Sequence, residues 1–149
     1  MKVVLIGGGS EYGLACARAL ANSQHLVSLW LWPADASEEE RAEIHAMAKR
    51  HHLPVMGTGD VNGADTQVIL TNLDPDVIIV APDWEGPVHR ATTDLAQVAF
   101  LTLCTGDDCV AVRKDGKTFG WRSIGEGGVG DALGALLVDA MEWLGVGDG

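Results

Sequence analysis

Short apolar runs alternate with amphipathic segments along most of the chain. Strands are expected where apolar residues cluster between glycine, proline or polar residues, and helices where apolar positions recur at helical spacing. The expected strands cover residues 2–6, 26–32, 53–56, 76–81 and 98–103. The expected helices cover residues 11–22, 38–51, 60–73, 87–96 and 131–144. The second helix opens with a Ser37–Glu40 capping box, and Asp60 or Asp65 is expected to cap the third.

This alternation predicts an α/β fold, a Rossmann-like parallel sheet with helices on both faces. Residues 109–113 and 117–124 flank Asp115-Gly116, a dipeptide typical of two-residue hairpins. The predicted domain therefore ends in a β-hairpin and a final helix. A flexible glycine cluster is expected at residues 125–130, and a frayed tail at residues 145–149. No repeat or linker divides the chain, so a single domain over residues 1–149 is predicted.

Composition narrows the class of function. The chain has 149 residues, 47% of them apolar, and 21 acidic against 10 basic residues give a net charge of −11. Nucleic acids and anionic membranes require a basic face, so neither is an expected partner. No membrane span or signal peptide is recognisable, and Cys16, Cys104 and Cys109 lack metal-ligand spacing. A cytoplasmic protein without a metal site is expected.

Ligand sites in open parallel sheets lie at the carboxyl ends of the strands. The first candidate is the glycine loop of Gly7, Gly8, Gly9 and Ser10, whose backbone N–H groups could bind an anion at a helix N-terminus. Its spacing, Gly-x-Gly-x-x-x-Gly, is one residue longer than the dinucleotide fingerprint, and Glu11 would repel phosphate. The alternative is a tight turn without a ligand.

The remaining candidates follow the later strands. Trp84 could stack on a planar ligand while Asp83 holds its polar edge, or Trp84 could simply pack at an interface. Cys104 would need a neighbouring base to act as a nucleophile, and His89 is the candidate base that the fold could bring near it. The alternative for Cys104 is a small buried side chain.

Four segments carry a resemblance to a known family. Ser10-Glu11-Tyr12 is similar to that family's Pro-Glu-Phe turn, and Trp32-Pro33-Ala34-Asp35 to its Gln-Pro-Asp. Residues 48–55 (AKRHHLPV) are similar to its Ala-Lys-x-x-x-Ile-Pro-Val, and residues 73–80 (LDPDVIIV) to its Leu-Asn-Pro-Asp-Leu-Ile-Val-Val. The family is the folate-dependent formyltransferases, and the resemblance covers roughly residues 1–104, then 109–144 more loosely.

The resemblance also indicates where the chemistry differs. The family's catalytic strand carries Asn-x-His, and Thr102 and Cys104 stand at those two positions. Asp115 corresponds to the family's catalytic aspartate, and the family's Pro-Ser-Leu-Leu-Pro segment is missing after residue 104. Thr102, Cys104 and Asp115 are thus the catalytic positions that the resemblance implies, with a folate as the implied cofactor. Without the Asn and His that polarise the formyl carbonyl and handle the proton, ordinary formyl transfer is not expected.

A second resemblance is to NAD-dependent sugar and inositol dehydrogenases, through the glycine loop, Val80-Ala81-Pro82 and His89. Their large substrate domain and Glu-Lys-Pro motif are missing. The leading hypothesis is therefore a reduced formyltransferase-like protein that binds a small ligand at the strand tips. The alternatives are a small NAD(P)-binding oxidoreductase-like protein and a non-enzymatic interaction module. A homo-oligomer, such as a homodimer that completes the site at its interface, is expected, and whether the chain is an enzyme stays open.

Overall fold

A single mixed sheet organises the molecule. The computed structural model describes the backbone of residues 1–147 and the side chains of residues 1–145. Seven strands pair in the order β3-β2-β1-β4-β5-β6-β7, the first five parallel and the last two antiparallel. The strands are β1 (Lys2–Ile6), β2 (Leu26–Pro33), β3 (Val55–Thr58), β4 (Val77–Val80), β5 (Ala99–Thr105), β6 (Cys109–Lys114) and β7 (Lys117–Ser123). The predicted α/β fold with a terminal hairpin and helix is confirmed.

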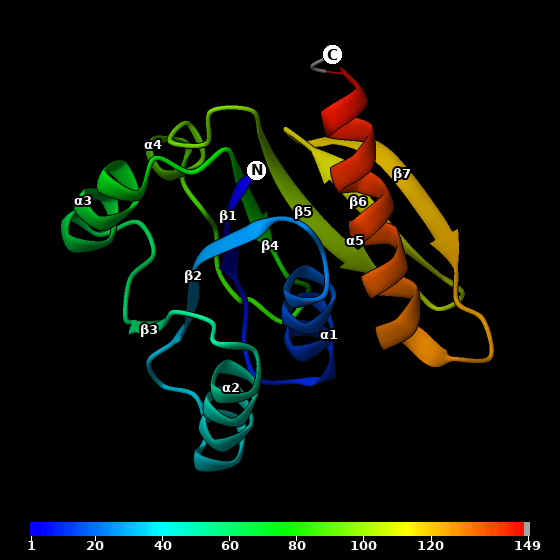
Figure 1. Ribbon diagram of the computed structural model, residues 1–149, viewed down its shortest axis with the longest axis horizontal. Coiled ribbons are helices and arrows are strands. Elements are labelled where there is room, and N and C mark those ends of the chain that lie inside the picture. Colours follow the sequence, from blue (N-terminus) through cyan, green and yellow to red (C-terminus); the bar gives the residue numbers. More distant parts are fainter. Residues whose placement is uncertain (148–149) are drawn as a thin grey trace.

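Helices cover both faces of this sheet (Figure 1). The helices are α1 (Glu11–Ala21), α2 (Glu38–His51), α3 (Ala64–Leu73), α4 (Arg90–Thr93) and α5 (Gly128–Gly147). One core cluster joins α1, α2 and α5 to the sheet, and the second lies under α3 and α4. The central strands are apolar over Val3–Ile6 of β1 and throughout β4, because these residues face both clusters.

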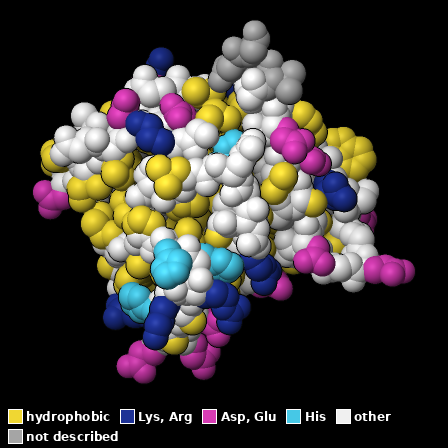
Figure 2. Space-filling model, in the orientation of Figure 1, with side chains coloured by type: hydrophobic (Ala, Val, Ile, Leu, Met, Phe, Trp, Pro, Cys, Tyr) yellow, Lys and Arg dark blue, Asp and Glu magenta, His cyan; other side chains and the backbone are white. Residues whose placement is uncertain are grey.

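The ends of α2 follow the predicted capping chemistry. Ser37 accepts a hydrogen bond from the backbone N–H of Glu40 at 3.2 Å, as the capping box requires. Acidic residues occupy the first turn and basic residues the last, an arrangement that complements the helix dipole. Figure 2 shows the same segregation, with His, Lys and Arg side chains gathered toward one end of α2 and acidic side chains at the other.

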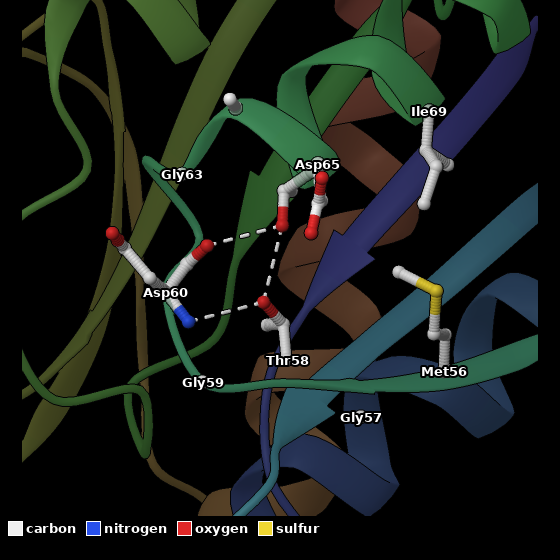
Figure 3. A pocket seen from close by; sticks show the side chains of 10 residues that line it. Met56, Gly57, Thr58, Gly59, Asp60, Gly63, Asp65 and Ile69 are labelled. Atoms are coloured by element: carbon white, nitrogen blue, oxygen red, sulfur yellow. Dashed lines mark hydrogen bonds between the residues drawn. The ribbon is translucent and has the colours of Figure 1, made fainter.

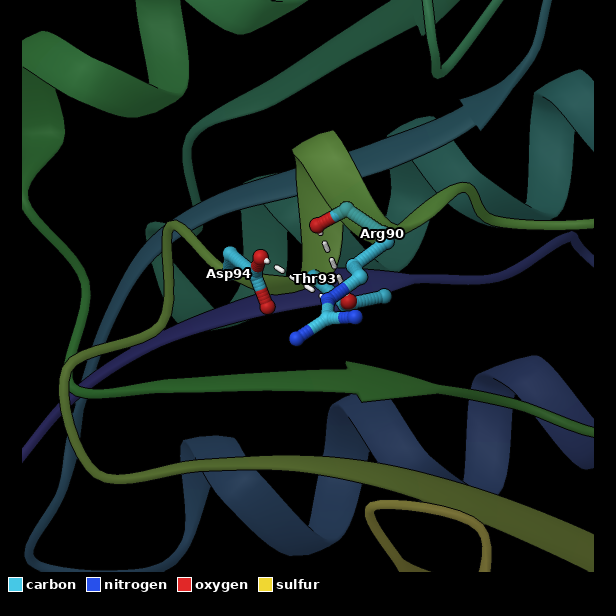
Figure 4. A network of polar contacts seen from close by, with 3 residues as sticks. All are labelled: Arg90, Thr93 and Asp94. Carbon is cyan, nitrogen blue, oxygen red and sulfur yellow. Dashed lines mark hydrogen bonds and ion pairs between the residues drawn. The ribbon is translucent and has the colours of Figure 1, made fainter.

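Three predicted elements need correction. The strand expected at residues 53–56 lies two residues later, as β3. Helix α3 begins only at Ala64 and has no side-chain cap, because the Asp60 carboxylate instead accepts from the Asn62 N–H at 2.9 Å in the preceding turn. The helix expected at residues 87–96 is limited to one turn, α4. Its Arg90–Asp94 ion pair (Figure 4) spans 3.4 Å, but both side chains are largely exposed, so the pair stabilises α4 little.

The final helix is longer than predicted. It starts within the glycine cluster, at Gly128, whose φ of +88° suits a residue without a side chain. Residues 145–147, expected to fray, continue α5, and residues 148–149 of the expected tail lie outside the described residues. Up to residue 147, no helix has the length and apolar character needed to cross a membrane.

The hairpin strands β6 and β7 have a helix on one face only. Three residues connect β5 to β6, in keeping with the missing segment noted above. Val110 and Val112 face α5 and are buried, whereas Trp121, opposite Ala111 on the other face, is 66% exposed. In Figure 1, α5 lies across β5, β6 and β7 on the near side.

Candidate functional site

The site predicted from topology lies where β1 and β4 end side by side. These parallel neighbours pair from Val3 and Val77 to Ile6 and Val80. After β1 the chain continues to β2 on one side of the pair, and after β4 it continues to β5 on the other side. Such a switch point is the usual ligand crevice of an open α/β sheet. The glycine loop follows β1, and Pro82, Asp83 and Trp84 follow β4. The structure therefore brings the cofactor-binding candidates Gly7, Gly8, Gly9, Ser10, Asp83 and Trp84 to one edge of the sheet.

The Asp83 carboxylate is bound to the glycine loop. One oxygen accepts from the backbone N–H of Gly8 at 3.0 Å. The other accepts from the Ser10 hydroxyl at 2.6 Å and from the backbone N–H of Gly13 at 3.1 Å. Ser10 also caps α1, since its hydroxyl oxygen accepts from the Tyr12 N–H at 3.2 Å. An internal carboxylate thus takes three of the hydrogen-bond donors that this loop and the start of α1 could offer to a ligand anion.

Two glycines, Gly9 of the loop and Gly13 in the first turn of α1, are explained by the close approach of neighbouring protein atoms. A Cβ on Gly13 would lie 2.0 Å from the carbonyl oxygen of Gly8 and 2.7 Å from an Asp83 carboxylate oxygen. A Cβ on Gly9 would lie 2.5 Å from the carbonyl oxygen of Glu40 in α2. Neither position has space for a side chain, so glycine is needed here to pack the loop against its own protein neighbours.

Two buried side chains complete the support of the loop. Trp30, fully buried in β2, donates its indole N–H to the carbonyl oxygen of Gly7 at 2.9 Å. Cys16, in α1, is fully buried beneath the loop region, and burial together with the charge of Asp83 raises the pKa of its thiol far above the ordinary value.

Trp84 lies between two clefts at this edge. The larger, about 830 Å³, is lined by carboxylates and small polar groups, and the smaller, about 350 Å³, is mainly apolar. Trp84 lines both of them. The acidic cleft includes Asp35, Ser37, Glu40, Asp83 and Glu85. The apolar cleft includes Pro82, Val88, Phe100 and Thr102.

The indole of Trp84 carries a polar atom without a partner. Its Nε1 is buried and has no hydrogen-bond acceptor among the described residues, and the same is true of Trp32 in β2. Trp32 packs edge-on against His45, with Arg41 over its ring, so it belongs to the β2–α2 contact. A buried donor without an acceptor costs free energy. Because the Trp84 Nε1 is buried, a ligand acceptor could reach its N–H only after the side chain had moved.

The catalytic candidates are not all gathered at this edge. Thr102 pairs with Val80 of β4 and lines the apolar cleft with Trp84. Cys104 lies two residues farther along β5, opposite Ala111, and is partly exposed. Asp115 occupies the hairpin turn, where its backbone N–H donates to the carbonyl oxygen of Phe100 at 3.1 Å. Phe100 lies at the amino end of β5, four residues or roughly 13 Å from Cys104 in an extended strand.

The structure therefore separates Asp115 from Cys104, and Thr102 is the one of the three that lines a cleft together with Trp84. His89, the candidate base for Cys104, is instead held just before α3: its backbone N–H donates to the Asn62 side chain at 2.7 Å. No group of three or more His, Cys, Asp or Glu side chains in the described part of the chain is arranged to hold a metal ion.

A further cleft of about 430 Å³ lies between β3 and α3 (Figure 3). Its polar side chains bond to one another. The Thr58 and Thr66 hydroxyls lie 3.1 Å apart, Thr66 donates to the Asp60 carbonyl oxygen, and the Asp60 N–H donates to Thr58. These contacts serve the β3–α3 turn, and none of them needs a ligand.

Sequence reasoning missed several lining residues. Ser37 and Glu40 were assigned only to the helix cap, and Glu85 and Thr58 were not singled out. The available signal was their position: Thr58 ends β3, and the others follow the carboxyl ends of β2 and β4, at the edge where the site was expected.

No family model and no curated protein matches this sequence. Solved structures do match its fold. The phosphoribosylglycinamide formyltransferase of Anaplasma phagocytophilum is 13% identical, with a TM-score of 0.58 over 94% of this chain and 80% of its own. The phosphoribosylglycinamide formyltransferase of Coxiella burnetii, in complex with CHES, is 14% identical, with a TM-score of 0.51 over 97% of this chain and 83% of its own.

The chain has the formyltransferase fold. The resemblance to folate-dependent formyltransferases that the four sequence segments indicated is thereby confirmed for the fold. At identities of 13% and 14% the likeness carries the arrangement of strands and helices and not the chemistry of the site. The site of this formyltransferase-fold protein must be judged from its own residues.

Proposed function

We propose that this formyltransferase-fold protein binds a small, planar ligand beside Trp84, at the carboxyl ends of its parallel strands, and is a reduced member of that structural class. The observation that carries the proposal is the position of Trp84 between two clefts, with a buried indole N–H that lacks an acceptor. An aromatic face, an apolar cleft and one unpaired donor are what a planar, partly polar ligand needs.

Thr102 contributes the polar group of the apolar cleft. Its hydroxyl can donate or accept one hydrogen bond to a ligand that lies against Trp84. A folate suits this combination of a flat ring and polar edges, and it is the cofactor that the family resemblance implies. Val88 and Phe100 supply the apolar walls that such a ring would contact.

Ordinary formyl transfer is not part of the proposal. Thr102 offers a single hydroxyl where the family has an asparagine amide, and Cys104 replaces the proton-handling histidine. Asp115 lies near the amino end of β5, away from Cys104. Proton transfer and oxyanion stabilisation each contribute large factors to catalysis, so a site without the groups that supply them should turn over very slowly.

The substrate named for the two structural neighbours is not extended to this chain. A phosphoribosyl compound carries a phosphate, and three donors that could bind one, the Gly8 and Gly13 N–H groups and the Ser10 hydroxyl, are already bonded to Asp83. The same contacts weigh against the NAD(P)-binding alternative, because a pyrophosphate needs those donors. A cytoplasmic location is proposed from the sequence alone.

The experiment is a thermal-shift panel of formyl-tetrahydrofolate, other folates, NADH, NADPH, nucleotide sugars and S-adenosylmethionine. A folate should raise Tm, because a ligand that binds only the native state stabilises it by about 2.7 kcal/mol at a hundredfold excess over Kd. Trp84→Ala should abolish the shift. Trp121→Ala is the matched control, since that tryptophan is exposed on the hairpin.

The results separate the hypotheses. A shift with NADH or NADPH that survives Trp84→Ala would overturn the proposal in favour of the oxidoreductase-like alternative. No shift with any compound would favour the interaction module. Formyl transfer should stay at background, and a turnover that is lost in Cys104→Ser would show that this strand is catalytic after all.

A further inference from the structure

The Asp83 carboxylate is seated on the glycine loop as a bound anion would be. Asp83 lies 75 residues from Gly8 and 70 from Gly13 along the chain, yet its two oxygens collect donors from both residues and from Ser10. Backbone N–H groups at a strand-to-helix turn are the donors with which such loops hold phosphate. Here the donors that converge on Asp83 are satisfied by a residue of the same chain.

The fit leaves no space for a second anion. A Cβ on Gly8 would lie 3.2 Å from an Asp83 oxygen, and a Cβ on Gly13 would lie 2.7 Å from the same oxygen. The loop therefore closes onto the carboxylate at contact distance. A phosphate could reach these N–H groups only after Asp83 had left them.

Other acidic side chains near Asp83 also disfavour a bound phosphate. Asp35, Glu40 and Glu85 line the same cleft, and no lysine or arginine is among the residues that line it. A phosphate in this cleft would meet negative charge and no positive side chain among the lining residues. A neutral or positively charged group would meet no such penalty.

We propose that Asp83 is a specificity-determining residue that substitutes for a ligand phosphate and closes the glycine loop to phosphorylated ligands. A ligand that binds beside Trp84 then has no phosphate at this end, and the part of it that faces the acidic cleft is neutral or carries an amine. This choice of ligand class rests on the proposed function. The closure of the loop does not, because it can be tested with inorganic phosphate alone.

The test compares the full chain and its variants by ¹H–¹⁵N NMR and thermal shift, with inorganic phosphate as the probe and chloride at matched ionic strength. In the unmodified chain, phosphate should leave the Gly8 and Gly13 amide signals in place. In Asp83→Ala, phosphate should shift both signals and raise Tm. Asp35→Ala is the control, because it removes a carboxylate from the same cleft without touching the loop, and it should stay unresponsive.

Two outcomes would overturn the inference. One is a phosphate-dependent shift of the Gly8 and Gly13 signals in the unmodified chain, a measurement that requires no variant to fold. The other is a folded Asp83→Ala protein that phosphate does not affect. Asp83→Ser, with a hydroxyl too short to replace the carboxylate, gives a second chance of a folded variant and should respond as Asp83→Ala does. If no organic ligand of the thermal-shift panel binds, the proposed function fails, and the phosphate experiment still decides whether Asp83 closes the loop.

Discussion

Two long-range side-chain contacts hold the glycine loop in place. Asp83 accepts three hydrogen bonds from it, and Trp30 donates one to the carbonyl oxygen of Gly7. Both contacts arise from the pairing of β1 with β2 and β4, which sets the residues beside each other although they are distant in sequence. The loop therefore depends on specific side chains as well as on its glycines.

The Trp30 contact can be tested by Trp30→Phe. The variant keeps an aromatic ring in the core but leaves the Gly7 carbonyl oxygen without its partner. A buried acceptor left unpaired costs about 1–3 kcal/mol, and the smaller ring adds to this loss. Urea denaturation should show a decrease of that size in the free energy of unfolding. Trp121→Phe, on the exposed hairpin face, should change it by less than about 0.5 kcal/mol.

The three cysteines should differ in reactivity. Burial and Asp83 raise the pKa of the Cys16 thiol, so at pH 8 it remains protonated as well as inaccessible. Cys104 and Cys109 are partly exposed. A chromogenic disulfide reagent should label these two in the native protein and the third only in denaturant. Cys104→Ser should lower the native count by one, and rapid native labelling of Cys16 would contradict the described packing.

Some individual residues of the candidate site could be predicted from the sequence. Asp83 and Trp84 stood out because they follow the most apolar strand, and Trp84 does line two clefts. The role of Asp83 as the partner of the glycine loop did not emerge, because it depends on β4 pairing beside β1. No local pattern encodes a contact over 75 residues.

At the scale of elements, the predictions succeeded where strong local signals exist. The capping box placed α2, and Asp115-Gly116 placed the hairpin, whose turn residues have φ values of +52° and +85°. They failed where tertiary contacts decide the boundary. Helix α3 starts after an Asx turn rather than at Asp60, and α5 begins inside a glycine cluster because its apolar stripe packs against α1 and β6.

The hairpin turn gives a test at this scale. Gly116 has φ +85°, which an alanine adopts only with strain, so Gly116→Ala should lower the free energy of unfolding by about 1 kcal/mol. Gly125 has no positive φ, and a Cβ there meets nothing within 4 Å. Gly125→Ala should therefore be neutral or stabilising by about 0.4–1 kcal/mol. Denaturant titration of both variants would contradict this account if the two effects were equal.

At the scale of the whole molecule, charge is distributed unevenly. The chain carries −11, yet the hairpin holds Arg113, Lys114, Lys117 and Arg122 against Asp115, and Arg122 is paired with Asp139 of α5 at 3.6 Å. The same hairpin presents Trp121 on a sheet face that α5 does not cover. A basic edge on an acidic protein, next to an exposed aromatic residue, fits contact with the acidic surface of a second copy of the chain.

The homo-oligomer expected from the sequence stays a prediction, and this surface says how to test it. Light scattering coupled to size exclusion should give a mass above that of one 15.7 kDa chain. Trp121→Glu should return the mass to the monomer, because it places a charge in the proposed contact. Trp143→Glu is the control, on the opposite face of the hairpin. A monomeric unmodified chain would contradict the prediction.

The account depends most on where a small ligand binds. The direct measurement is a ¹H–¹⁵N NMR titration of the unmodified chain with the folates and dinucleotides of the panel. The account predicts that a folate shifts the signals of Asp83, Trp84 and Thr102, including the Trp84 indole N–H, and leaves the Asp115 turn unchanged. Shifts confined to residues far from Trp84, or no shift with any compound, would contradict it.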